Sequence, residues 1–188
     1  MAKKKMFDIK SKKGIMLDIG CGEGKEPRCV GMDIRPLPGV DIVHDVEELP
    51  YPLPDECCLS ILARHIVEHI NPAKCLFIKV MDEWWRIMKP YGKLMIVTPY
   101  PGSAQWYADP THCNFVSEMT IAYFAPLHPA GLWAGYSPKP WFVVANAWNV
   151  NGNLEVMLAK MPLSDLKNII EKKEIPDIKK IMQRNKHE

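Results

Sequence analysis

The chain has 188 residues, of which 47% are hydrophobic and 24% are charged. This length and composition predict one compact domain with a sizeable core, and they exclude collagen-like, low-complexity and fully disordered classes. Lys and Arg together number 24, against 22 for Asp and Glu. This near-neutral balance gives no bulk field for a nucleic acid, so a polyanionic partner would need a local basic patch.

Targeting and redox signals are weak in this sequence. The longest apolar stretches fall far short of the roughly 20 residues that a membrane-spanning helix needs. The lysine-rich residues 1–13 are not followed by the apolar run of a signal peptide. The six cysteines include no C-x-x-C pair, which favours reduced thiols. We therefore expect a cytoplasmic protein with no membrane partner.

Four short, largely apolar runs in the first third of the chain are typical of buried parallel strands. They cover residues 14–19, 29–33, 40–44 and 57–63. The first run leads directly into Gly20-Cys-Gly-Glu-Gly24, a glycine-rich turn.

A helix and a fifth strand follow these runs. Asn71-Pro72 places a capping residue before a proline suited to the first helical position, and apolar residues then recur every four positions between Leu76 and Met88. This spacing predicts a core-packed helix that Pro90 stops. Residues 92–98 read as the next strand, and the order strand, helix, strand indicates a parallel sheet of the α/β class.

The last third of the chain predicts a long loop, a hairpin and a helical tail. The loop covers residues 99–115, and Ser117 can cap a short helix after it. Two strand-like runs, 141–150 and 154–161, are joined by an Asn-Gly turn, which predicts an antiparallel hairpin. We therefore divide the chain into a basic N-terminal segment (1–13), a folded domain (14–161) and a charged helical tail (162–188).

The glycine turn carries the first chemical signal. Glycines at the carboxyl edge of an α/β sheet allow a ligand to approach the backbone closely. A dinucleotide site would have its third glycine where this chain has Lys25. Asp33, at the end of the second strand, can accept hydrogen bonds from both hydroxyls of a ribose. The pattern favours a nucleoside ligand over a dinucleotide.

Several short motifs occur in a characteristic order. They are Leu17-Asp-Ile-Gly-Cys-Gly-Glu-Gly24, Val30-Gly-Met-Asp33, Asp45-Val-Glu-Glu-Leu-Pro50, His65-Ile-Val-Glu-His69, Met88-Lys-Pro-Tyr-Gly92 and Asp109-Pro-Thr-His112. Over roughly residues 14–124 the sequence thereby resembles the class I S-adenosylmethionine-dependent methyltransferases in their small bacterial and phage-like form. Each motif is weak alone, whereas their joint order and spacing are specific.

The resemblance implies a Rossmann-like, seven-stranded sheet over the 14–161 domain, with the last hairpin antiparallel, and S-adenosylmethionine as cofactor. It implies that Gly20 and Gly22 face the methionine part, that Asp33 holds the ribose, and that Asp45 with Val46 borders the adenine. We also count four further residues as cofactor-binding candidates: Asp18, Cys21, Ile34 and Arg64.

One departure from the family concerns the first crossover. The family places a full helix between the glycine turn and the second strand, whereas residues 25–29 are too few for one. We expect this helix to be reduced to about one turn. The cofactor carboxylate then loses part of a helix N-terminus, and Lys25 or Arg28 would supply positive charge instead.

Candidate catalytic residues are His65, Asp109 and His112. A hydroxyl acceptor benefits from a base that titrates near neutral pH, and His65, His69 or His112 could serve. Two interpretations of the 106–112 segment stay open. Either Asp109 and His112 contact the acceptor, or they bond to each other and pin the loop.

The segment His65-Ile-Val-Glu-His69 also matches H-x-x-E-H, a zinc motif of metalloproteases. Such a site needs a helix that presents both histidines and a further ligand. The spacing of His65 and His69 shows no evident third ligand, so we expect no metal requirement.

Three functions fit these residues. The favoured one is methyl transfer to an oxygen, nitrogen or carbon of a small-molecule or sugar-bearing acceptor. The first alternative is RNA or DNA methylation with basic termini as backbone contacts. It is less favoured because Ala63-Arg64-His65 stands where base-nitrogen methyltransferases resemble one another in an Asp/Asn-Pro-Pro-aromatic motif. The second alternative is a non-catalytic cofactor-binding subunit. The sequence leaves the oligomeric state open.

Overall fold

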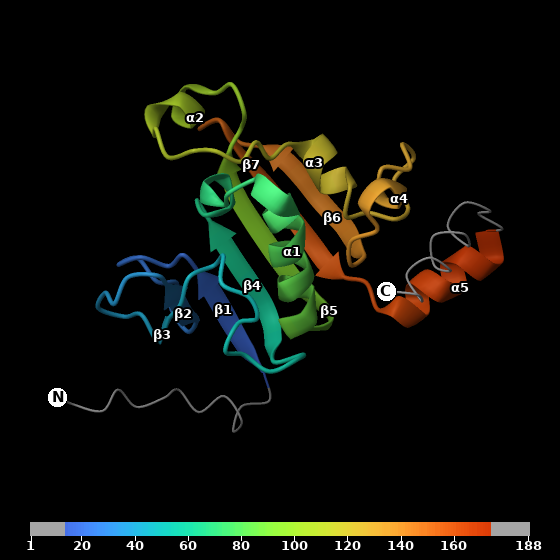
Figure 1. The fold of residues 1–188 in the computed structure, drawn as a ribbon, viewed down its shortest axis with the longest axis horizontal. Helices are drawn as coiled ribbons and strands as arrows, with labels where there is room; N and C mark the ends of the chain where they lie inside the picture. The colour runs from blue at the N-terminus through green and yellow to red at the C-terminus, as the bar shows by residue number, and fades with distance from the viewer. Residues whose placement is uncertain (1–13, 174–188) are drawn as a thin grey trace.

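The computed structural model describes residues 14–173, so the basic segment 1–13 and residues 174–188 of the tail lie outside the described residues. Within the described range the chain forms a seven-stranded sheet in the order β3-β2-β1-β4-β5-β7-β6 (Figure 1). The strands are β1 (Ile15–Ile19), β2 (Val30–Asp33), β3 (Ile42–Val43), β4 (Cys58–Arg64), β5 (Met88–Pro99), β6 (Trp141–Trp148) and β7 (Asn153–Lys160).

The sheet is parallel except for its last two strands. β1 pairs in parallel with both β2 and β4, and β3 and β5 extend the parallel part on either side. β7 is antiparallel to β5 and to β6. The Asn-Gly turn joins β6 to β7, with Gly152 at a φ of +78°. The predicted α/β class and the C-terminal antiparallel hairpin are confirmed.

No helix separates β1 from β2, as the sequence predicts. The backbone N–H groups of Gly20 and Cys21 donate to the carbonyl of Met32, at 2.8 and 3.2 Å. These bonds extend the parallel pairing of β1 and β2 past Ile19, and turns alone carry the chain from there to the start of β2. The edge of the sheet therefore carries a short loop where a crossover helix would otherwise begin.

The helices are α1 (Leu76–Ile87), α2 (Ala104–Ala108), α3 (Glu118–Ala122), α4 (Trp133–Tyr136) and α5 (Leu163–Lys173), with 3-10 turns η2 (Val67–His69) and η3 (Ala73–Cys75). Ser117 caps α3, as predicted, by accepting a hydrogen bond from the Thr120 backbone. None of the helices between residues 14 and 173 combines the length and apolar character that a bilayer crossing requires.

Both ends of α1 differ from the prediction. Asn71 Oδ1 accepts from the Ala73 backbone at 2.9 Å, so it bonds to the first residue of η3 and does not cap α1. The left-handed φ values of Lys74 and Cys75 then separate the two helices. At the other end α1 stops at Ile87 because Met88 is already extended, and Pro90 lies inside β5.

α1 lies over one face of the sheet (Figure 1) and brings its apolar stripe to the core. Trp84 is fully buried, and its indole N–H donates to the hydroxyl of Tyr51 at 3.1 Å. Glu83 accepts from the Tyr51 backbone at 2.7 Å. α1 therefore also anchors the proline-rich segment that precedes β4.

The opposite face of the sheet is covered less well. Leu62, Met95 and Met157 are aligned across β4, β5 and β7, and all three are only half-buried. α5 packs elsewhere, where Leu166 and Ile170 bury against a small cluster that includes Trp133. In the described part of the chain, the main core thus lies on the α1 side.

Replacing Trp84 tests this core. Trp84→Ala removes a large, fully buried side chain and leaves a cavity beneath α1, so we expect the free energy of unfolding to fall by about 3–5 kcal/mol. Tyr107→Ala is the matched control, because Tyr107 is 76% exposed, and it should change stability by less than about 0.5 kcal/mol. Urea denaturation measures both. Equal stabilities for the two variants would contradict the packing described for α1.

Candidate functional site

The carboxyl ends of the parallel strands meet at one edge of the sheet and border a cavity of about 180 Å³. Gly20 follows β1, Asp33 ends β2, and the 44–47 segment follows β3. The cavity is lined by Ile19, Gly20, Met32, Asp33, Ile34, His44, Asp45, Val46, Glu47, Ile66 and His69. Of the predicted cofactor-binding residues, the fold brings Gly20, Asp33, Ile34, Asp45 and Val46 together here.

Backbone hydrogen bonds hold both carboxylate oxygens of Asp33 in this cavity. Its Oδ2 accepts from the Gly22 backbone at 2.8 Å, and its Oδ1 accepts from the Arg35 backbone at 2.9 Å. Burial by itself would raise the pKa of Asp33, but these backbone donors and the Arg35 guanidinium outweigh it and lower the pKa. The carboxylate is therefore held ionised in a fixed orientation, with lone pairs left for a ligand.

The glycine turn is shaped by backbone dihedrals. Gly20 and Gly22 have φ values of +67° and +52°, a region that side chains disfavour. A Cβ at Gly20 would also lie 3.0 Å from the side chain of Ile66. Glycine at position 20 therefore keeps the floor of the cavity open where the chain leaves β1.

The wall after β3 is a short turn. Asp45 Oδ1 accepts from the Glu47 backbone at 2.9 Å, the side-chain-to-backbone bond of an Asx turn. The Tyr51 hydroxyl donates to the carbonyl of Val46 at 2.9 Å. These bonds hold Val46 in the wall, while Ile34 is largely exposed on the β2 side.

Asp18 and Arg64 lie beside the cavity, outside its lining. Asp18 is 1% exposed, and its Oδ2 accepts from the Glu26 backbone at 2.7 Å and from Arg64 Nη2 at 3.4 Å. Arg64 also reaches the carbonyl of Gly24. Their contacts tie the 20–29 loop to the ends of β1 and β4.

Two more predicted cofactor residues have backbone or packing contacts. Gly22 donates its N–H to Asp33. Cys21 is buried, and its Sγ lies 2.7 Å from the position that a Cβ would take at Gly31. Burial raises the pKa of the Cys21 thiol. Cys21 therefore packs between the first two strands as a small apolar side chain.

Two basic side chains, Lys25 and Arg35, lie near the glycine turn with different partners. Lys25 forms an ion pair with Asp41 at 2.8 Å. The Arg35 guanidinium instead lies over the glycine turn, with Nη2 3.7 Å from the position of a Cβ on Gly22. Arg35 is largely exposed and can turn toward a carboxylate there. Its position two residues after Asp33 was the only sequence signal for it.

Sequence reasoning did not assign His44, Glu47, Ile66 and His69 to the cavity lining, although all four follow strand ends. His69 belongs to η2, a turn that the H-x-x-E-H pattern does not predict. Ile66 faces Gly20 across the turn. The position of a residue after a strand end thus predicts that it lies near the cavity, but it does not predict which side chains line the cavity.

His65 and Glu68 form a charge pair after β4. His65 Nδ1 lies 3.3 Å from Glu68 Oε1, and Glu68 is completely buried. The Glu68 carboxylate raises the pKa of His65 against an opposing effect of burial. Thr98 donates its hydroxyl to Glu68 Oε2 at 3.1 Å. The pair favours the imidazolium form of His65.

The loop after β5 is tied to η2. The backbone N–H groups of Cys113 and Asn114 donate to the carbonyl of Glu68, at 2.9 and 3.0 Å. The Asn114 side chain donates to the carbonyl of Val67 at 2.8 Å. These bonds bring the loop next to the turn that contributes His69 to the cavity.

Asp109 and His112 are brought near the cavity through different partners. Asp109 Oδ1 accepts from the Thr111 hydroxyl at 2.6 Å, and Thr111 Oγ1 is 3.0 Å from His69 Nδ1. His112 Nδ1 lies 2.9 Å from the carbonyl of Trp106. The His69 and His112 rings are 4.9 Å apart. The side chains of Asp109 and His112 thus each pin the loop, through Thr111 and Trp106.

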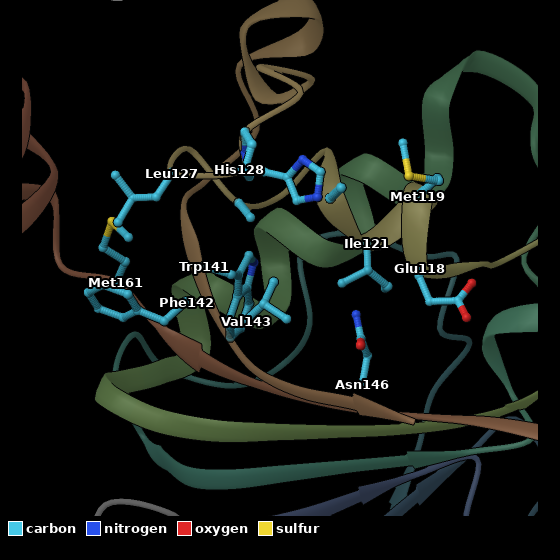
Figure 2. A pocket seen from close by; sticks show the side chains of 13 residues that line it. Glu118, Met119, Ile121, Leu127, His128, Trp141, Phe142, Val143, Asn146 and Met161 are labelled. Atoms are coloured by element: carbon cyan, nitrogen blue, oxygen red, sulfur yellow. The ribbon is translucent and has the colours of Figure 1, made fainter. Parts of the chain in front are cut away.

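A larger cavity, of about 320 Å³, lies away from the glycine turn between α3 and β6 (Figure 2). Trp141, Phe142 and Val143 line it from β6, and Ile121 lines it from α3. Glu118 and Asn146 lie together at one side in this view. Its lining is mainly apolar, and it contains none of the sequence-predicted site residues.

No protein-family model matches the chain, and no curated protein sequence matches it. Solved structures do resemble it. A methyltransferase of Archaeoglobus fulgidus described as SAM-dependent is 20% identical, with 77% of this chain and 85% of that chain covered at a TM-score of 0.53. A Mesorhizobium loti protein described as an S-adenosylmethionine-dependent methyltransferase is 11% identical, with 78% and 90% covered at 0.54.

The N-methyltransferase NodS of Bradyrhizobium japonicum, solved in complex with S-adenosyl-l-homocysteine, is 11% identical, with 78% of each chain covered at a TM-score of 0.52. At these identities the likeness concerns the fold. The chain has the Rossmann-like, seven-stranded fold of the class I methyltransferases, with the first crossover helix reduced to turns.

The role of Asp18 in the loop can be tested by stability. Asp18→Ala removes a buried carboxylate that accepts from the Glu26 backbone and from Arg64, and we expect the free energy of unfolding to fall by about 1–3 kcal/mol. Asp18→Asn keeps an acceptor oxygen and should recover part of this loss. Glu23→Ala, which removes an exposed carboxylate from the same loop, is the control. Denaturant titration reports the changes, and an Asp18→Ala variant as stable as the parent would contradict the bracing role.

Proposed function

We propose that the chain is a methyltransferase that binds S-adenosylmethionine with its adenosine in the cavity beside Asp33 and transfers the methyl group to a small-molecule or sugar-bearing acceptor. The observation that carries the proposal is the ionised, oriented Asp33 carboxylate in a cavity at the carboxyl edge of the sheet. In open α/β sheets this edge is where ligands bind.

The residues present fit a nucleoside. Asp33 Oδ2 keeps a lone pair beside its Gly22 bond, and Oδ1 gains one when the exposed Arg35 side chain, whose Nε lies 3.4 Å away, turns toward the cofactor carboxylate, so the two oxygens can accept from both ribose hydroxyls. The side chains of Ile34 and Val46 offer apolar surface for a flat base. The cavity of about 180 Å³ is smaller than the roughly 300–1,000 Å³ of sites that enclose a drug-sized ligand. The adenosine part would occupy it, and the amino-acid part would extend along the glycine turn toward Arg35.

The cofactor supplies an electrophilic methyl group when bound, so the protein has mainly to align an acceptor with it. His69 lines the cavity, and its ring begins a row that continues away from the cavity. Ring centroids are 4.9 Å apart for His69 and His112, 5.2 Å for His112 and Trp106, and 4.5 Å for Trp106 and Phe115. The first two pairs of rings are inclined to each other by 65° and 43°, and Trp106 is buried, so an acceptor beside the cavity would contact the imidazoles of His69 and His112 and the exposed ring of Phe115.

Binding of the nucleoside is tested with Asp33→Ala. Loss of charged hydrogen bonds to ribose should weaken S-adenosyl-l-homocysteine binding about tenfold to a hundredfold. Calorimetry measures this, with Asp165→Ala as a control that should bind normally. Unchanged affinity in Asp33→Ala would refute the placement of the ribose, and an absence of binding by the parent chain would refute the proposed function.

The acceptor side is tested with His112→Ala and Asp109→Asn. If the loop positions the acceptor, His112→Ala should lower turnover by about a hundredfold or more, whereas affinity for S-adenosyl-l-homocysteine stays near the parent value. A role limited to pinning predicts a loss of stability of about 1 kcal/mol or more alongside the loss of activity. Full turnover in both variants would remove the loop from the site.

The assay for turnover needs an acceptor. Labelled S-adenosylmethionine incubated with separate pools of small metabolites, sugar conjugates and RNA identifies the class that takes up label. Label in the first two pools supports the proposal. Label in RNA alone would favour nucleic-acid methylation, and cofactor binding with no labelled product in any pool would favour a non-catalytic subunit.

A further inference from the structure

Glu68, His69 and His112 form a cluster of potential metal-binding side chains where η2 meets the loop after β5. One donor atom from each residue can be chosen so that all three atoms lie within 4.8 Å of one another. The residues are separated by up to 44 positions in the sequence and are joined by the backbone bonds between Glu68 and the 113–114 segment. We propose that this cluster binds one divalent transition-metal ion.

The hydrogen bonds of both imidazoles leave one nitrogen free for an ion. His112 Nδ1 faces the carbonyl of Trp106 at 2.9 Å, and because a carbonyl can only accept, this nitrogen carries the proton. The Thr111 hydroxyl donates its proton to Asp109, so it accepts from His69 Nδ1 at 3.0 Å. Both Nε2 atoms therefore carry lone pairs.

These outer contacts are the kind that orient metal ligands. Histidines bound to metals generally donate their second N–H to a carbonyl, a carboxylate or another fixed acceptor, which sets the tautomer and the ring orientation. His112 has the Trp106 carbonyl in this position, and His69 has Thr111, which Asp109 orients in turn. The 106–112 segment thus contributes one ligand and positions another.

Glu68 gives an independent observation. It is completely buried, and its Oε1 has no hydrogen-bond partner. Buried carboxylates are costly unless they are paired or coordinate a metal. The same Oε1 faces the His65 imidazole, whose Nδ1 lies 3.3 Å away as an ion-pair contact without a hydrogen bond, so this oxygen keeps lone pairs for a further ligand. A cation held by the two histidines would give this carboxylate oxygen a second charged neighbour beside His65.

The donor set indicates the class of ion. Two imidazole nitrogens and one carboxylate oxygen suit zinc, iron, cobalt or manganese, whereas calcium and magnesium favour oxygen ligands. Donors of a tetrahedral zinc ion lie about 3.3 Å apart, so the three side chains would close in on an ion by small rotations. Three protein ligands leave one coordination position open.

The fold supplies the third ligand that the sequence motif lacked. The H-x-x-E-H pattern directs attention to His65 and His69, and no residue near them in sequence completes that pair. In the structure His69 combines instead with its neighbour Glu68 and with His112 from the loop. Since His69 also lines the nucleoside cavity, an oxygen of the acceptor could take the open position, a step that rests on the proposed function.

Zinc and cobalt titrations of the metal-free full chain test the site without any activity assay. We expect one Zn²⁺ per chain in competition with a chromophoric chelator, and a visible absorption band of bound Co²⁺. His69→Ala and His112→Ala should each weaken Zn²⁺ binding by at least about a hundredfold. His128→Ala and Cys113→Ser, which alter a histidine and a thiol outside the ligand set, should leave the affinity unchanged.

Several outcomes would overturn the proposal: no stoichiometric binding by the parent chain, unchanged affinity in His112→Ala, or equal losses in the His128 or Cys113 variants. Glu68 is completely buried, so Glu68→Gln is informative only if the variant folds. The His69→Ala and His112→Ala variants therefore decide whether the cluster binds the ion. Calorimetry with S-adenosyl-l-homocysteine on the same samples separates the two proposals. Nucleoside binding without zinc binding overturns the metal site alone, and the reverse result overturns the proposed function alone.

Discussion

The buried carboxylate of Asp18 is the contact on which the edge of this sheet depends. In a larger α/β protein a crossover helix connects β1 to β2, whereas here only the turns of residues 20–29 connect them. Asp18 Oδ2 binds the Glu26 backbone and Arg64, so one carboxylate joins the ends of β1 and β4 to the loop between β1 and β2. The glycine turn lies in the loop that Asp18 holds, and its Gly22 in turn donates to Asp33.

The turn after β4 has a comparable role on the other side of the cavity. The carbonyls of Glu68 and Val67 accept three hydrogen bonds from Cys113 and Asn114. A long loop that would otherwise be independent is thereby held against η2. The same turn presents His69 both to the nucleoside cavity and to His112. The proposed cofactor, acceptor and metal sites therefore all include or adjoin His69.

Several of the acidic side chains near the site accept hydrogen bonds from backbone N–H groups. Asp33, Asp45 and Asp109 each accept from a backbone N–H two residues further along. Asp33 is the last residue of β2, and the other two follow β3 and α2 closely. Short acidic side chains favour such turns. The same bonds keep the carboxylates oriented, so a structural role and a ligand role are compatible in one residue.

The sequence alone determined the α/β class, the parallel pairing of the first strands, the final hairpin and the shortened first crossover, because apolar periodicity, glycine turns and the count of residues between strands are local properties. It also indicated Gly20, Asp33 and Asp45, since strand ends of a parallel sheet share one edge. It misplaced both ends of α1, where left-handed residues and an early extended Met88 override the proline signals. Only the tertiary structure decided that Arg35 lies beside the glycine turn while Lys25 pairs with Asp41, and that His112 lies next to Glu68 and His69, because side-chain partners far apart in sequence depend on how loops pack.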